Sequence, residues 1–481
     1  MCIGIEIAPN FDIIRLPHPN QPKRGANLMI YQNDDFENTQ NKIFLAIKKL
    51  QLGELLRKAN IKKSCGVSAF EVFKFLLLLV FQGKNLFRFL NSKHKSEAVS
   101  KNTYYRFLNE ASYNWRKFLL LLSAKVITIF SGLTNEKRVK ALILDDSVVA
   151  RNRSSNVELL AKVYDHVEHK FKKGFTMLTL GWSDGYSFIP VAFNMLSSAN
   201  KCNRYQEISD TIDHRTNGYK VRQESIIQKT QAAVLLIQKA LNAGIQADYV
   251  LMDTWFTTEP MIKSILKEGL DVIGMVKQLK QKYLYEGKEY TLPQLKKFIH
   301  HNCHNIVKGS IIVRTKAENI PVKIVFVQNR NNKSEYLYLL STDCSLNENE
   351  IVRIYGNRWS IEVFFKASKS FFKLGTEFQS RSYDTMISHT TIVFTRYILL
   401  EWIRRNDNDY KTYGELFFMF CDDIQDMVFE TALQSLMALF VEQLNILSAD
   451  ITNIIKSKLQ DWVASQATVI RSLFVNLGWE S

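Results

Sequence analysis

The sequence has few cysteines and no long apolar runs, and both shortages exclude classes of protein. Its six cysteines are dispersed without paired spacing, which argues against a secreted fold held by disulfides. The longest uncharged apolar runs, Phe75 to Phe81 and Phe118 to Ser123, are far shorter than the roughly 20 residues of a membrane-spanning helix. The N-terminus lacks the basic segment, apolar core and small-residue cleavage site of a secretory signal. We therefore expect a cytoplasmic protein with reduced thiols.

Acidic residues are also in the minority. The 481-residue chain carries 47 Asp and Glu against 63 Lys and Arg, a formal net charge of +16. Such an excess favours a polyanionic partner through counterion release, with nucleic acid ahead of a membrane surface. With 46% hydrophobic and 23% charged residues, the composition is that of a globular chain of two to four domains.

The N-terminal part divides into an arm and a helical region. Residues 1–45 carry four prolines and many Asn and Asp residues, which predicts an irregular arm. Residues 46–135 read as helices, and the segments 66–81 and 100–110 each contain a serine suited to cap a helix. Two short helices of which the second is basic suit a helix-turn-helix in a DNA groove, and an all-helical packing domain explains the pattern equally well.

From residue 141 short apolar strands alternate with amphipathic helices. The predicted elements are, in order, strands at 141–147, 175–185 and 186–194, a helix at 223–243, a strand at 248–253, a helix at 258–268 and a strand at 271–276. This order of three strands, helix, strand, helix, strand is that of a ribonuclease-H-like core, a mixed sheet flanked by helices. The next stretch carries alternating segments typical of further strands.

These patterns predict an α/β fold, in which a ribonuclease-H-like mixed sheet is interrupted by a β-rich insertion and accompanied by helical N- and C-terminal regions. The expected domains are an arm at 1–45, a helical DNA-binding domain at 46–135, a first part of the catalytic core at 140–276, an insertion subdomain at 277–350, a second part of the core at 351–400, and a helical C-terminal region at 401–481. Amphipathic segments in the last region suit packing or a dimer contact.

A single carboxylate stands among cations between residues 355 and 369. On one continuous helix, Tyr355, Arg358, Glu362 and Lys369 would fall within an arc of about 60°. Apolar residues between them, Trp359 among others, can bury much of the remaining surface. The polar stripe suits a metal plus a phosphate backbone, since Glu offers a hard oxygen and Arg and Lys offer phosphate partners. An exposed helix face with an Arg–Glu pair is the simpler alternative.

Two further acidic positions stand at the ends of apolar strands. Asp145 or Asp146 lies near the end of the strand at 141–147, and Asp253 ends the strand at 248–253. A carboxylate at such a place is unfavourable unless something compensates it, and each acid alone is explained by a turn or a helix cap. Together with Glu362 they indicate a Mg²⁺ or Mn²⁺ site for in-line phosphoryl transfer.

At these residues the chain resembles the DDE transposases of bacterial insertion sequences, in particular insertion-sequence family 4. The resemblance covers about 140–400 and rests on Asp145-x-Ser147, on Asp253 after an apolar strand, and on the spacing Tyr-x2-Arg-x3-Glu-x6-Lys. The family's Asp-x-Ser/Thr pattern selects Asp145 over Asp146, a choice that a one-residue shift of the strand would reverse.

The resemblance implies roles for these residues. Asp145, Asp253 and Glu362 would be catalytic metal ligands for Mg²⁺, with Mn²⁺ as a substitute. The basic and aromatic members of the spacing motif, Tyr355, Arg358 and Lys369, would contact the transposon-end DNA. Some relatives hold a flipped base on an aromatic side chain of the insertion, for which Tyr283, Tyr285 and Tyr290 are candidates.

The implied activity is cut-and-paste transposition by two-metal strand cleavage and transfer. Its partners would be double-stranded DNA, both the terminal inverted repeats of the element and the target, and a second copy of the chain in the synaptic complex. The implied location is the bacterial cytoplasm, in association with the nucleoid. Two alternatives are a DNA-binding regulator that has lost catalysis and a nuclease acting on RNA–DNA hybrids with the same core.

Overall fold

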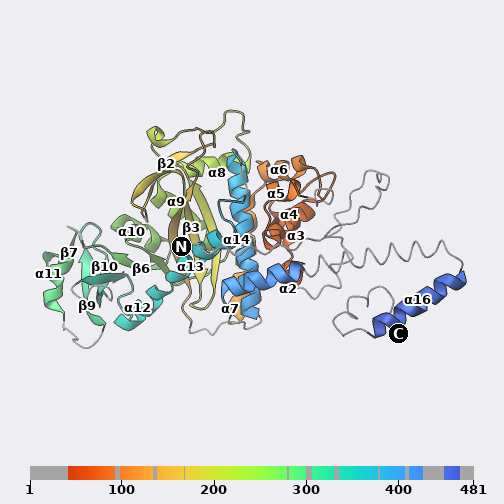
Figure 1. Cartoon of the computed structure of the whole chain (residues 1–481). Coiled ribbons are helices and arrows are strands. Elements are labelled where there is room, and N and C mark those ends of the chain that lie inside the picture. The colour runs from red at the N-terminus through yellow and green to blue at the C-terminus, as the bar shows by residue number, and fades with distance from the viewer. Residues whose placement is uncertain are drawn as a thin grey trace, which may run out of the picture.

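The computed structural model describes residues 42–92, 98–133, 138–166, 168–278, 281–299, 306–329, 335–377, 380–406, 411–425 and 449–465. It is an α/β protein in which one large mixed sheet is flanked by helices and joined to a group of N-terminal helices (Figure 1). The arm predicted at 1–45 lies almost entirely outside the described residues. No helix among the described residues is long and apolar enough to cross a membrane.

Within the described residues the sheet has eleven strands, which pair in the order β2-β3-β1-β5-β6-β11-β10-β9-β7-β8, while β4 also pairs with β3. Their bounds are β1 Ala141–Ala150, β2 Ala161–Asp165, β3 Lys170–Ser183, β4 Phe188–Leu196, β5 Tyr249–Met252, β6 Asp271–Val276, β7 Lys282–Tyr285, β8 Lys288–Thr291, β9 Val307–Thr315, β10 Pro321–Gln328 and β11 Tyr336–Ser341. Strands β4, β3, β1, β5 and β6 form the predicted ribonuclease-H-like sheet, so that fold class is confirmed.

The middle of this sheet is parallel. Strand β1 pairs in parallel with β5, and β5 with β6, whereas β3 runs antiparallel to both β1 and β4. In the β1–β5 pair Leu144 lies opposite Met252, and both are fully buried. The pairing stops at these two residues, so the acids that follow them, Asp145 within β1 and Asp253 after β5, are brought to one place.

The predicted hairpin at 175–194 is confirmed and is turned by an aspartate. The Asp184 carboxylate accepts hydrogen bonds from the backbone N–H groups of Tyr186 (3.0 Å) and Ser187 (2.8 Å). Gly185 adopts φ +81°, a left-handed conformation that glycine tolerates without strain. The turn therefore has its chemical cause in the Ser-Asp-Gly sequence.

The β-rich stretch at 277–350 does not form a separate sheet. Strand β11 pairs antiparallel with β6, and β10, β9, β7 and β8 follow outward from it. These strands therefore continue the central sheet past β6, and they stretch away from the N-terminal helices (Figure 1).

The helices before the sheet are α2 Lys42–Lys49, α3 Leu52–Lys58, α4 Ala69–Leu78, α5 Leu86–Leu90, α6 Lys101–Asn109 and α7 Trp115–Gly132. The predicted cap of the first helix signal is present, because the Ser68 hydroxyl accepts from the Glu71 N–H (3.1 Å). Helix α6 buries Tyr104, Phe107 and Leu108 against its neighbours and leaves Arg106 exposed. Its use as a DNA-reading helix stays a prediction.

The later helices are α8 Asn217–Ser225, α9 Lys229–Asn242, α10 Glu259–Lys267, α11 Leu292–Leu295, α12 Glu348–Gly356, α13 Trp359–Ser370, α14 Tyr383–Asn406 and α16 Ala449–Ala464. Helix α14 is buried along almost its whole length, between β4 and the N-terminal helices (Figure 1). It runs past residue 400, so the expected boundary at 400–401 falls inside this helix.

One buried arginine joins the N-terminal helices to the rest of the molecule. Arg396 of α14 is fully buried and donates to the backbone oxygens of Leu76 (2.6 Å) and Leu77 (2.8 Å) near the end of α4. The same guanidinium forms a bidentate pair with the buried Glu377 (2.6 and 2.9 Å). A single hydrophobic cluster also runs from the helices into the sheet. The two regions are therefore packed as one unit.

Candidate functional site

The two adjacent acids of β1 face opposite sides of the sheet, as strand geometry requires. Asp145 faces α13, where its Oδ2 accepts a hydrogen bond from the Arg358 guanidinium at 2.8 Å. Asp146 faces α9, where its Oδ1 accepts from the Lys229 ammonium at 2.9 Å. Of the two acids, Asp145 is therefore the one that lies beside Glu362.

Arg358 connects two of the predicted carboxylates. One end of its guanidinium binds Asp145, and the other donates to Oε1 of Glu362. The side chains of Asp145 and Arg358 are each 16% exposed, whereas Glu362 is 35% exposed. The structure thus brings residues from β1 and from the start of α13, distant in the sequence, to one polar cluster where β1 and β5 stop pairing.

The four motif residues do not lie on one continuous helix, which corrects the sequence-based expectation. Helix α12 ends at Gly356 and α13 begins at Trp359, with Arg358 in the turn between them. In this turn the backbone N–H of Arg358 donates to the carbonyl of Tyr355 (3.0 Å), three residues back instead of four. Gly356 and Asn357 are weak helix formers, which is a physical reason for the break.

Tyr355 and Lys369 nevertheless lie beside the cluster. The Arg358 guanidinium carbon is 6.0 Å from the centre of the Tyr355 ring. Burial raises the pKa of Tyr355 to about 12, although Arg358 opposes the shift. The Lys369 ammonium donates to the Ser147 hydroxyl (2.6 Å), and partial desolvation lowers its pKa. Both motif residues therefore flank the face of β1 that carries Asp145.

Asp253 comes directly after β5 and shapes the following turn. Its Oδ1 accepts from the backbone N–H groups of Trp255 (2.9 Å) and Phe256 (3.2 Å), and its carbonyl accepts from the Thr257 hydroxyl (2.6 Å). Close packing against β6 holds this turn, since a Cβ at Gly274 would collide with the Thr257 side chain. The predicted turn role is therefore present, and the remaining oxygen of Asp253 has no hydrogen-bond partner described.

The pKa of the Asp145 carboxyl is raised mainly because the group is buried. Burial raises this pKa to about 7, Arg358 lowers it, and the neighbouring Asp253 and Asp146 raise it further. Even with a bound guanidinium, the ionised form is therefore disfavoured. A second cation near Asp145 would relieve this cost.

The donor set fits a hard divalent cation in its chemistry. Asp145, Asp253 and Glu362 supply only carboxylate oxygens, which Mg²⁺ and Mn²⁺ prefer. As the side chains stand, no three His, Cys, Asp or Glu residues of the described chain converge closely enough to enclose a metal ion. The Arg358 guanidinium lies between two of the three carboxylates, so the geometry is that of a cluster bridged by an arginine.

A second cluster, which sequence reasoning missed, lies on the opposite face of β1. The Lys229 ammonium, held by Asp146, is 3.5 Å from the centre of the Trp255 ring, a close cation–π contact. Trp255 is 39% exposed and follows Asp253 by two residues. Lys229 carried no signal in the sequence, because only the packing of α9 on the sheet brings it to β1.

Burial separates the aromatic candidates. Tyr283 has no exposed surface and belongs to the core of the sheet extension, which removes it as a base-holding residue. Tyr285 and Tyr290 are partly buried and pack against Phe298. Trp359, expected to help bury the helix, is instead 63% exposed.

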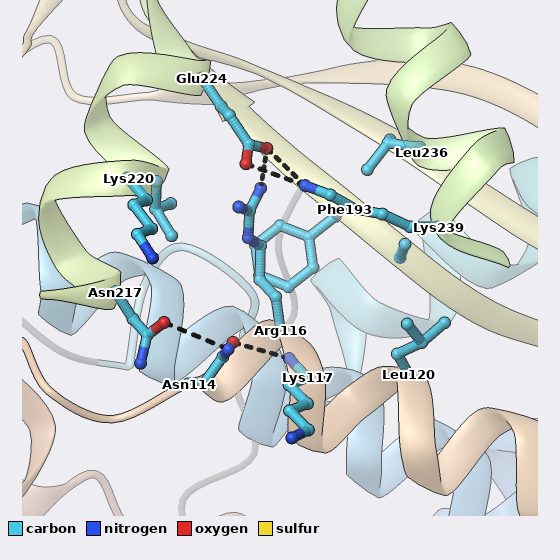
Figure 2. Close-up of a pocket in the computed structure, with 12 residues that line it drawn as sticks. Asn114, Arg116, Lys117, Leu120, Phe193, Asn217, Lys220, Glu224, Leu236 and Lys239 are labelled. Carbon is cyan, nitrogen blue, oxygen red and sulfur yellow. Dashed lines mark hydrogen bonds and ion pairs between the residues drawn. The ribbon is translucent and has the colours of Figure 1, made fainter. Parts of the chain in front are cut away.

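A cavity of about 320 Å³ lies away from these residues, between the start of α7 and helices α8 and α9 (Figure 2). None of its described lining residues is a predicted site residue. Its Arg116 (2.9 Å) and Lys239 (2.7 Å) both pair with Glu224, as the dashed lines in Figure 2 show. The charged groups in this cavity thus pair with one another. We interpret the cavity as a packing gap between helices and not as a ligand site.

Comparison with known proteins gives two family matches. A model described as DDE superfamily endonuclease matches residues 76–289, and a model described as Transposase DDE domain matches residues 211–399. No curated protein matches the chain. The two matches together include all six predicted site residues, and they support a DDE transposase with nuclease-type activity on DNA.

Proposed function

We propose, on the premise that the chain is a DDE transposase, that it moves an insertion sequence by cut-and-paste transposition and belongs near insertion-sequence family 4. One strand at each element end would be hydrolysed, and the freed 3′-hydroxyl would attack and join the end to target DNA. The observation that carries the proposal is the guanidinium of Arg358, which binds the carboxylates of Asp145 and Glu362 at once.

We assign Asp145, Asp253 and Glu362 as the metal ligands, with Mg²⁺ as cofactor and Mn²⁺ as substitute. Bound metal ions would supply activation of the attacking oxygen and stabilisation of the leaving oxygen. The chain's own part is to hold the ligands. The β1–β5 pairing, which stops at Leu144 and Met252, brings Asp145 next to Asp253, and the backbone N–H groups of Trp255 and Phe256 orient Asp253. The raised pKa of Asp145 supports a site that gains from a second cation.

We assign Tyr355, Arg358 and Lys369 to the element-end DNA. The position of Lys369 supports this role, because its ammonium reaches β1 at Ser147, two residues beyond Asp145. The Arg358 guanidinium, which pairs with two carboxylates, has the charge and the planar fork that suit a phosphate oxygen.

The remaining regions complete the proposal. Residues 46–135 would read the terminal inverted repeats, supported by a hollow whose lining includes Lys62, Lys63 and Arg106. The stretch 277–350 would act as the insertion, and 401–481 would contact the second copy of a homodimer. The expected setting is the bacterial cytoplasm at the nucleoid.

The test is strand cleavage of labelled element-end DNA, taken from the sequence flanking the native gene, with Mg²⁺, Mn²⁺ or EDTA. The three variants Asp145→Ala, Asp253→Ala and Glu362→Ala should each abolish metal-dependent nicking and leave DNA binding largely intact. Glu350→Ala is the matched control, because Glu350 lies on α12 close in sequence and pairs with Arg353. Loss of binding in all three variants would indicate structural acids instead.

The alternative is a DNA-binding regulator that keeps the fold without catalysis. It is not favoured, because all three acids and the complete spacing motif are present. Binding of both ends without nicking, in either metal, would favour the regulator.

A further inference from the structure

A groove of about 760 Å³ opens where β1 ends, beside the chain that leaves α13. One wall begins at Ala150, the last residue of the strand that carries Asp145. The other wall includes Gly375, shortly after the helix that carries Glu362. Both walls therefore continue elements that hold proposed metal ligands.

The lining of this groove is strongly basic. Of twelve described lining residues, three are arginines, Arg151, Arg153 and Arg381, and none is acidic. The acids nearby are engaged elsewhere: Glu158 pairs with Arg222 (2.6 Å) and Glu377 pairs with Arg396 (2.6 Å). The three arginine charges are thus not balanced by the surrounding carboxylates.

One of the three arginines is bound to the backbone, and the other two are available. Arg151 donates to the carbonyl of Gly375, which ties the end of β1 to the chain after α13. Its Nε is buried and has no hydrogen-bond partner within the described chain. Arg153 and Arg381 are exposed, and neither forms an ion pair with a described residue. Two guanidinium forks are therefore free to bind an anion.

The remaining lining points to the backbone of a nucleic acid. Hydroxyl and amide side chains such as Asn152, Ser154 and Thr376 stand among the arginines, and these groups commonly bind phosphate and sugar oxygens. The twelve described lining residues include no aromatic ring on which a base could stack. The groove therefore suits recognition that does not depend on sequence.

We propose that this groove binds the sugar–phosphate backbone of the DNA that leaves the catalytic site, an inference that rests on the proposed function. Lys369, bonded to Ser147, lies between the Asp145 cluster and the groove along β1. From Asp145 to Ala150 the strand rises roughly 17 Å, at about 3.3 Å per residue. This length corresponds to about five base pairs of duplex at 3.4 Å each.

The first test measures binding of the element-end duplex in EDTA at several salt concentrations, with Arg153→Ala/Arg381→Ala as the variant. Its slope of log affinity against log salt should be shallower by about 2, since each phosphate contact contributes about 0.9. The matched control is Lys267→Ala/Lys288→Ala, which removes two exposed charges on α10 and β8. An equal slope in the two double variants would overturn the proposal.

The second test locates the contact. A scan of single methylphosphonates, which neutralise one phosphate each, should weaken binding about five base pairs from the scissile phosphate. That loss should disappear in the Arg153→Ala/Arg381→Ala background. If the variant binds DNA more weakly but shows the same methylphosphonate profile as the native chain, the two arginines attract DNA without contacting a particular phosphate. That result would overturn the groove assignment.

These outcomes separate the two proposals. Because the binding tests omit metal, a groove effect without any cleavage by the native chain would keep the groove and remove the catalytic assignment. Normal cleavage by the native chain, with no change in DNA binding in the Arg153→Ala/Arg381→Ala variant, would keep the catalytic assignment and remove the groove.

Discussion

Asp145 and Asp146 are adjacent on β1, and yet each binds a cation from a different layer of the molecule. Asp145 pairs with Arg358 next to α13, and Asp146 pairs with Lys229 of α9, each at 2.8 to 2.9 Å. Only the first cation also binds Glu362. This asymmetry allows the two acids to be tested against each other with the same substitution.

Asp145→Asn should reduce metal-dependent DNA nicking below detection, because the amide removes a charged oxygen from the proposed metal site. Asp146→Asn should retain activity within roughly tenfold of the native chain, as expected of a residue that acts through its neighbours. The measurement is single-turnover nicking at saturating DNA. Equal loss in both variants would contradict the assignment of Asp145.

Metal binding should depend on pH around neutrality. The folded pKa of Asp145, about 7, lies above its ordinary value because of burial, so the carboxyl is largely protonated below pH 7. Mn²⁺ must displace this proton, and its affinity should therefore rise by up to about tenfold per pH unit between pH 5.5 and 7 and level off above that.

Calorimetric titration of the native chain with Mn²⁺ across this range checks the expectation, and Asp145→Asn should flatten the profile. The same shift also affects stability. A raised folded pKa stabilises the fold below the unfolded pKa, and this contribution is lost as the pH rises through about 7. A metal affinity that does not change with pH would contradict the role of Asp145.

Removal of Arg358 should shift the pH dependence of Mn²⁺ binding to higher pH. Its guanidinium is the main group that lowers the pKa of Asp145, so Arg358→Ala should raise the midpoint of Mn²⁺ binding above that of the native chain. The midpoint for Arg358→Lys should lie between those of Arg358→Ala and the native chain, because one ammonium cannot bridge two carboxylates as the forked guanidinium does. Arg353→Ala, an exposed arginine paired with Glu350, serves as control and should leave the midpoint unchanged.

The buried pair of Arg396 and Glu377 should be essential for stability. Arg396→Met leaves a buried carboxylate without its partner, and such a break costs about 3–5 kcal/mol. Adding Glu377→Gln should recover part of the loss, since the residual charge is removed. Urea unfolding measures both, and Lys58→Met, which breaks an exposed pair with Glu54, should change stability by about 0.5 kcal/mol or less.

The sequence was sufficient for elements whose cause is local. The apolar runs that precede Asp145 and Asp253 predict strands. Both strands are present, and their apolar side chains are buried in the sheet. The hairpin follows from Ser183-Asp184-Gly185, whose turn chemistry does not depend on distant residues. The resemblance implied that Asp145 and Glu362 share a site, but it did not predict that Arg358 bridges them.

The failures have nonlocal causes. A 3.6-residue period cannot show that the helix ends at Gly356, nor that Trp359 then faces solvent. The contact of Lys229 with Asp146 joins residues 83 positions apart and depends on the packing of α9. The pairing of β11 with β6 likewise could not be predicted, because the alternation of apolar and polar residues does not show which strand is the neighbour.

On the proposed role of residues 46–135 in reading the element ends, Arg396 also limits how this chain can acquire a new specificity. Its guanidinium needs two carbonyl oxygens, now supplied by Leu76 and Leu77, at one place on the packed helices. Replacement of the helical region by an unrelated one would leave two N–H donors of Arg396 without acceptors, unless the new backbone placed carbonyl oxygens at the same positions. New recognition is therefore more accessible through substitutions on the exposed faces of the existing helices than through exchange of the whole region.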